Sequence, residues 1–128
     1  MVNQENTFKV KKVNDIVVIS TLTDFTLSME RIMEDLYLEL CNNGYKKILF
    51  EFNPENHITS AGIAILISLI DEGTKNNQRI GFIGLSSHFK KIFNLIGITR
   101  YVTIYNSIEQ AIHNMSGLYS SECVERSN

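Results

Sequence analysis

Short strand-like segments alternate with helix-like segments along most of this 128-residue chain, and this order limits the fold more than any other feature. Residues 7–21 contain two β-rich runs separated by Asn14 and Asp15, which are typical turn residues. Further strand-like segments are YKKILFEF, RIGFIG and YVTIY. Strands that alternate with helices predict an α/β fold, in which helices pack on a central sheet.

Three of the intervening segments have the apolar spacing of amphipathic helices. In the first, Ser28 is a suitable N-cap and Gly44 a suitable C-terminal stop. The apolar stripe between them consists of Met29, Ile32, Met33, Leu36, Leu40 and Cys41. The segments SSHFKKIFNLIG and NSIEQAIHNM are also predicted helices. The cap of the first is Ser86 or Ser87, and the cap of the second is Asn106 or Ser107.

The segment NHITSAGIAILISLIDEG, residues 56–73, fits two interpretations by its pattern alone. Its β-branched content suits a buried strand, whereas its length and polar ending suit a buried helix. A connection from YKKILFEF to a parallel strand RIGFIG needs a crossover, which is usually a helix. We therefore predict a helix over residues 61–77, apolar almost all round because the sheet and neighbouring helices cover it.

Composition argues against several classes of protein. The formal net charge of −2 disfavours a nucleic-acid binder, whose binding face is usually strongly basic. Cys41 and Cys123 are too few for a disulfide framework and lack metal-ligand spacing, which indicates a reducing compartment. The N-terminus lacks the apolar core of a signal peptide, and residues 61–70 are too short a run to span a membrane. We expect a soluble, cytoplasmic protein.

Motifs of known catalytic sites are missing from the sequence. There is no GxGxxG, no phosphate-binding GxxxxGK[ST] and no HExxH. His57, His88 and His113 have no ligand spacing, and GLSSHF lacks the second glycine of a nucleophile elbow. We therefore expect an interaction protein with no catalytic activity, no cofactor and no metal.

Thr59 and Ser60 lie at the N-terminus of the predicted helix, where the first four backbone N–H groups lack intrahelical partners. One explanation is that Thr59 or Ser60 caps these donors, which stabilises a helix by about 1 kcal/mol. The same donors, together with the helix dipole, also favour an anion such as phosphate at this place. The two explanations are compatible, and the residues alone leave both open.

Most of residues 8–113 resembles the STAS domain found in bacterial anti-sigma-factor antagonists. In that family a strand and a loop lead to a D-[ST]-[SG]-G-[LI]-[GA] motif that opens an apolar helix. Here ITSAGIAILISLIDEG holds the place of the motif, NDIVVISTLTDFT resembles the second strand and its loop, and HFKKIFNLIGITRYVTIYNSIEQAI resembles the last part. The resemblance implies one domain over residues 1–116, with a mixed central β-sheet of about five strands and about four helices packed on it. We expect residues 117–128 to form a flexible tail.

The resemblance also implies a function in partner switching. In antagonist members, a serine kinase that is also the anti-sigma factor phosphorylates the hydroxylated residue after the motif's Asp. Ser60 occupies that position, while Thr59 replaces the Asp and Ala61 follows. The unphosphorylated form binds the kinase and frees the sigma factor, and a PP2C-type phosphatase resets the switch. The implied partner-binding residues are Asp24, Phe25, Thr26, Thr59, Ser60, Ala61 and Gly62.

Two other interpretations remain open for a STAS domain. The chain could be the soluble STAS subunit of a membrane lipid-transport complex that docks on an ABC ATPase, because those members also have a small hydroxylated residue at this place. It could also be a STAS scaffold that is not phosphorylated, in which Ser60 is only a helix cap.

Overall fold

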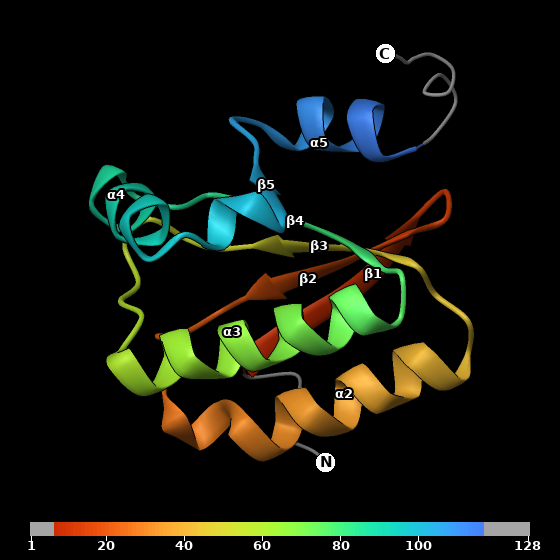
Figure 1. Ribbon diagram of the computed structural model, residues 1–128, viewed down its shortest axis with the longest axis horizontal. Coiled ribbons are helices and arrows are strands. Elements are labelled where there is room, and N and C mark those ends of the chain that lie inside the picture. Colours follow the sequence, from red (N-terminus) through yellow and green to blue (C-terminus); the bar gives the residue numbers. More distant parts are fainter. Residues whose placement is uncertain (1–6, 117–128) are drawn as a thin grey trace.

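The computed structural model describes residues 7–116, which contain a five-stranded sheet and four α-helices (Figure 1). The predicted tail, residues 117–128, lies outside the described residues. The strands are β1 (Phe8–Val13), β2 (Ile16–Thr21), β3 (Lys47–Glu51), β4 (Arg79–Ile83) and β5 (Val102–Ile104). The helices are α2 (Glu30–Asn42), α3 (Ser60–Lys75), α4 (Ser87–Ile96) and α5 (Ile108–Met115), with 3₁₀ turns η1 (Leu27–Met29) and η2 (Ile98–Arg100).

The sheet is mixed, as predicted, with its strands in the order β1-β2-β3-β4-β5. β1 and β2 form an antiparallel hairpin, and Asn14 in its turn has φ +58°, a left-handed conformation that asparagine tolerates well. The remaining neighbours are parallel, and a helix connects each parallel pair. The prediction that the segment after β3 forms a crossover helix is therefore confirmed by α3.

Both faces of β2 are buried, which explains its continuous apolar run. Val17 and Ile19 point into the larger core cluster, whereas Ile16 and Val18 point into the smaller one. A strand that is covered on both sides has no solvent-facing side, so apolar and polar residues do not alternate along it.

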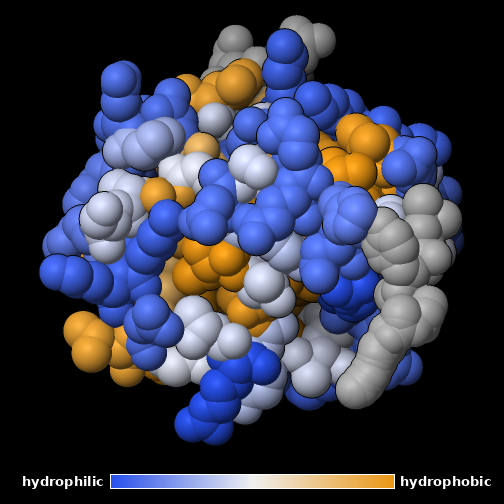
Figure 2. Space-filling view, turned by 90° about the horizontal axis from the view of Figure 1, so that it is seen from above, coloured by the Kyte–Doolittle hydropathy of each residue, from blue (hydrophilic) through white to orange (hydrophobic). Residues whose placement is uncertain are grey.

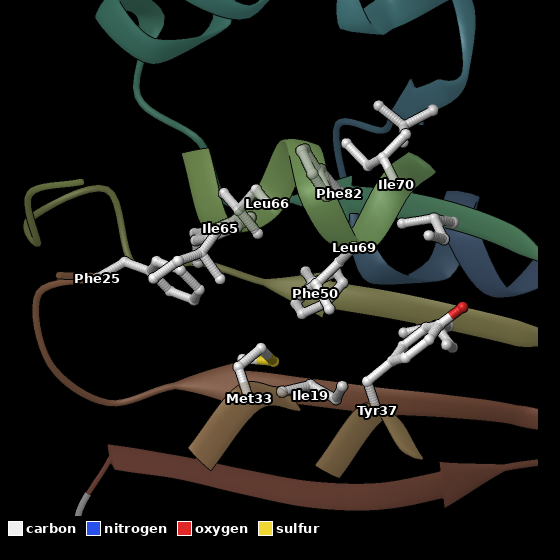
Figure 3. Close-up of a cluster of buried hydrophobic side chains, with 14 of the residues drawn as sticks. Ile19, Phe25, Met33, Tyr37, Phe50, Ile65, Leu66, Leu69, Ile70 and Phe82 are labelled. Atoms are coloured by element: carbon white, nitrogen blue, oxygen red, sulfur yellow. The ribbon is translucent and has the colours of Figure 1, made fainter. Parts of the chain in front are cut away.

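The larger core cluster lies between the sheet and helices α2, α3 and α4. In Figure 3, Met33 of α2 and Leu69 of α3 gather around Phe50 of β3 and Phe82 of β4. Among the helices of residues 7–116, only α5 packs on the opposite face. Figure 2 shows the molecule from the side of α4 and α5, where hydrophilic side chains surround an apolar hollow. The second face therefore has a thinner cover than the first.

Two of the predicted helix caps are present, and one is wrong. Ser86 accepts the N–H of Phe89 at the start of α4, and Ser107 caps α5. Ser28, in contrast, does not cap α2, because η1 places it inside a 3₁₀ turn. Its hydroxyl lies 2.8 Å from Thr26 Oγ1 instead.

The expectation that the sheet and neighbouring helices cover α3 almost all round is also wrong. Ile65, Leu66 and Leu69 are buried, but Ala64, Ile67, Ser68 and Asp71 are exposed. The reason is that the sheet and α2 cover only one side of α3, which leaves the other side in solvent (Figure 1). Among residues 7–116, no helix combines the length and apolar character that crossing a membrane requires.

Candidate functional site

Two loops lie side by side at one edge of the sheet, where β2 and β3 end. Phe25, after β2, forms an isolated parallel bridge with Ile58, after β3. The Phe25 N–H donates to the His57 carbonyl at 2.8 Å, and the Thr59 N–H donates to the Phe25 carbonyl at 2.9 Å. Because β2 and β3 are parallel neighbours, their carboxyl ends meet at the same edge. The fold thus brings together the two groups of residues that were predicted to form the partner surface.

Asp24 holds the two loops together through its side chain. Its Oδ1 accepts the backbone N–H of His57 at 2.8 Å, although Asp24 is itself exposed. The sequence predicted Asp24 only as a partner-binding residue. Its role in fixing the loop could not be predicted, because it depends on two segments that are 33 residues apart.

Thr59 is the N-cap of α3, which decides between the two capping candidates. Its Oγ1 accepts the N–H of Gly62 at 3.1 Å and donates to the Phe25 carbonyl at 3.3 Å. The single hydroxyl proton of Thr59 is therefore already used, and Thr59 is partly buried.

Ser60 is the first residue of α3 and is exposed. Within residues 7–116, its hydroxyl makes no hydrogen bond, and neither do the backbone N–H groups of Ser60 and Ala61. Unpaired N–H groups at the positive end of a helix dipole favour a negative charge nearby. The site therefore combines an accessible hydroxyl with donors that suit the oxygens of a phosphate.

Phe25 and Gly62 shape the site from beneath. The Phe25 side chain is only 1% exposed and points toward Ile65 in the core (Figure 3). A Cβ on Gly62 would lie 2.3 Å from the Phe25 carbonyl oxygen, so the two backbones touch only because residue 62 is glycine. Of the seven predicted partner-binding residues, these two offer a partner almost no side-chain surface.

Leu27 is a surface residue that the sequence did not single out. It follows Thr26 directly, and 60% of it is exposed. A leucine close to the start of a helix is usually expected to be buried in the core. The exposure of Leu27 becomes clear only once the position of η1 is known. An exposed large apolar side chain next to the two loops adds a candidate contact to the surface.

Within the described residues, no group of three or more His, Cys, Asp or Glu side chains could hold a metal ion. A cavity lined by residues of both loops, among them Thr23, Phe25 and Ile58, has a volume of about 10 Å³. That is room for roughly one water molecule, so the site is a surface and not a ligand pocket.

Comparisons with known proteins bear on the family and the fold of the chain. The STAS domain model matches residues 8–111. A candidate anti-sigma factor antagonist of Thermotoga neapolitana, a homolog of TM1081, is 19% identical over 111 residues, or 86% of this chain and 98% of that protein.

Solved structures share the fold at low sequence identity. The crystal structure of TM1081 from Thermotoga maritima, also a candidate antagonist, matches with a TM-score of 0.76 at 17% identity, over 89% of this chain and 98% of that one. SpoIIAA, a Bacillus cell fate determinant, matches in its phosphorylated form with a TM-score of 0.62 at 16% identity, over 84% of this chain and 97% of that one. Its unphosphorylated form, described as an anti-sigma factor antagonist, matches with a TM-score of 0.67 at 16% identity, over 87% of this chain and 99% of that one.

Proposed function

This chain belongs to the STAS domain family, and on that premise we propose that it is an anti-sigma-factor antagonist switched by phosphorylation of Ser60. Unphosphorylated, it binds a serine kinase that is also an anti-sigma factor, and so frees the sigma factor. Phosphorylation by that kinase releases it, and a PP2C-type phosphatase restores the binding form. The observation that carries the proposal is the exposed hydroxyl of Ser60 at the N-terminus of α3, which makes no hydrogen bond to any described residue. The names of the relatives support it, since SpoIIAA has been solved in both forms.

The chemistry of the two hydroxyls favours Ser60 over Thr59 as the phosphoacceptor. Phosphorylating Thr59 would remove the proton that bonds the Phe25 carbonyl and would disturb the cap on Gly62. Phosphorylating Ser60 breaks no hydrogen bond within the described residues. The Ser60 hydroxyl is also the one that a kinase can reach without opening the loop.

The added phosphate acts on binding and leaves the fold intact. It carries about −1.5 to −2 charges, and a helix N-terminus stabilises a negative charge by about 0.3–1 kcal/mol. A kinase that packs closely over the loops would have to bury this charge without a partner, which costs several kcal/mol. Since about 1.4 kcal/mol changes an affinity tenfold, one phosphate is enough for a switch.

The partner surface consists of the two loops and the start of α3. Asp24, Leu27 and Ser60 supply its exposed side chains, and Thr26, Thr59 and Ala61 are accessible between them. Recognition residues commonly lie on loops that a rigid scaffold holds in place, and the sheet edge provides that scaffold here. The chain acts as a cytoplasmic, non-enzymatic regulator in this proposal.

Labelling with radioactive ATP tests the phosphoacceptor. The anti-sigma-type serine kinases of the host are purified and incubated with wild type, Ser60→Ala and Thr59→Val, and circular dichroism checks that each variant is folded. We expect one kinase to label the wild type and Thr59→Val but not Ser60→Ala. Labelling of Ser60→Ala to the level of the wild type would show that the acceptor lies elsewhere.

A further inference from the structure

A groove beside α3 concentrates exposed apolar side chains away from the two loops. Its walls are Ile67 of α3, Ile96 at the end of α4 and Tyr101 after η2, which are 42%, 47% and 59% exposed. Its floor is the buried pair Ile70 and Ile98, and its volume is about 430 Å³. We call this feature the α3–α4 groove. Exposed apolar patches with a polar rim commonly mark interaction sites.

The exposed face of α3 connects Ser60 to the α3–α4 groove. Ser60, Ala64, Ile67 and Asp71 are all exposed, and their spacing of three or four residues places them in one stripe along the helix. At about 1.5 Å of rise per residue, Ile67 lies roughly 10 Å along the helix axis from Ser60. The stripe continues directly into the groove, because Ile67 and Asp71 both line it.

A protein interface of ordinary size is large enough to cover both Ser60 and the near wall of the α3–α4 groove. A standard interface buries about 800 Å² on each partner, which corresponds to a round patch with a radius of about 16 Å. A partner centred on Ser60 therefore extends over Ile67 and the near wall of the groove. A separate partner for the groove would have to share this surface.

We propose that the α3–α4 groove is a second contact for the same kinase/anti-sigma factor, which fills it with an apolar segment. This inference rests on the proposed function. Ile67 is the α3 residue of the groove nearest to Ser60, and it already lies about 10 Å along the helix from the phosphate. An apolar contact at that distance involves no charge of its own, so the phosphate leaves it unchanged. The groove thus strengthens binding of both the unphosphorylated and the phosphorylated form, while Ser60 sets the difference between them.

Titration calorimetry with the purified kinase that labels Ser60 tests this contact. Ile67→Ser and Tyr101→Ser remove apolar surface from the groove, and Leu38→Ser is the matched control, since Leu38 is 59% exposed on α2 outside the groove. We expect each groove variant to lose about tenfold in affinity in both phosphorylation states, which is the loss typical of a central apolar contact. Leu38→Ser should stay within about twofold, as energetically neutral surface positions do. Thermal melts verify that all three variants are folded.

Each contrary result has a distinct meaning. If the groove variants bind like Leu38→Ser while Ser60→Asp loses affinity, the groove proposal is wrong and the proposed function stands. A loss confined to the unphosphorylated form would contradict the claim that the contact is independent of the phosphate. Self-association of the wild type that Ile67→Ser abolishes, measured by ultracentrifugation, would identify a second copy as the occupant and overturn the proposal. If no kinase binds the wild type, the proposed function fails and the groove contact fails with it.

Discussion

Thr59 and Ser60 are adjacent in the chain, yet their hydroxyls have different surroundings. Thr59 uses its oxygen twice, toward Gly62 and toward Phe25, whereas Ser60 faces solvent. The sequence predicted a cap at this place but could not say which residue supplies it. The choice depends on where α3 begins, and the bridge between Phe25 and Ile58 sets that point.

Removing the Thr59 hydroxyl should destabilise the fold, because its oxygen caps α3 and also bonds the Phe25 carbonyl. We expect Thr59→Ala to lower the free energy of unfolding by about 1 kcal/mol, because the Gly62 N–H loses its acceptor. Thr59→Ser keeps the hydroxyl and should retain most of that stability. Urea denaturation of the two variants measures the difference. An equal loss in both would mean that the methyl group of Thr59, not its hydroxyl, matters.

A methyl group at residue 62 should disturb the loops that present Ser60. In Gly62→Ala, the new Cβ would meet the Phe25 carbonyl oxygen at 2.3 Å, and backbone cannot move aside as a side chain can. We expect a loss of about 1–3 kcal/mol, as for other overpacked sites. Gly73→Ala on the same helix is the control, because the nearest atom there is the mobile Cδ1 of Ile80 at 2.7 Å. Urea denaturation that gives equal stabilities for the two variants would refute the close contact.

At the scale of elements, the order of strands and helices could be predicted from the sequence, and details of their ends could not. Apolar periodicity and the need for a parallel crossover correctly predicted which segments are strands and which are α-helices. This includes the ambiguous segment that forms α3. Ser28 was assigned as a cap because a polar residue before an apolar stripe usually is one, but η1 starts the helical turn earlier. The exposed stripe of α3 was missed because Ile67 is as apolar as its buried neighbours, and only packing distinguishes them.

Burial of the Tyr37 hydroxyl gives the fold a dependence on alkaline pH. The Tyr37 hydroxyl of α2 donates to Gln78 Oε1, before β4, at 2.6 Å, and burial raises the pKa of Tyr37 to about 12. The ordinary tyrosine pKa is about 10, so the folded state holds this proton more tightly than the unfolded chain. The corresponding stability is complete below pH 10 and is lost as the pH rises toward 12.

Tyr37→Phe should remove this part of the alkaline loss. Urea denaturation of wild type and variant at several pH values between 10 and 12 compares the slopes of stability against pH, and the variant should be less steep. Parallel curves for the two proteins would contradict a raised pKa of Tyr37.

At the scale of the whole molecule, the residues that hold the two loops in place are distinct from Ser60. The sheet edge and the hydrogen bonds of Asp24, Phe25 and Thr59 hold the loops in place, and Ser60 takes no part in them within the described residues. The sequence could predict the position of Ser60 from its motif, but the pairing of the two loops became visible only in the structure. A charge at Ser60 should therefore weaken the binding of the kinase, while the melting temperature of the protein stays within a few degrees.

The most direct test of the central claim is titration calorimetry of the kinase with two forms of the wild-type protein, one unphosphorylated and one phosphorylated at Ser60 by that kinase. The account predicts that the phosphorylated form binds at least tenfold more weakly, a difference of about 1.4 kcal/mol or more, with no loss of folded structure. Equal affinity of the two forms would contradict the account and leave Ser60 as an exposed residue at the start of α3.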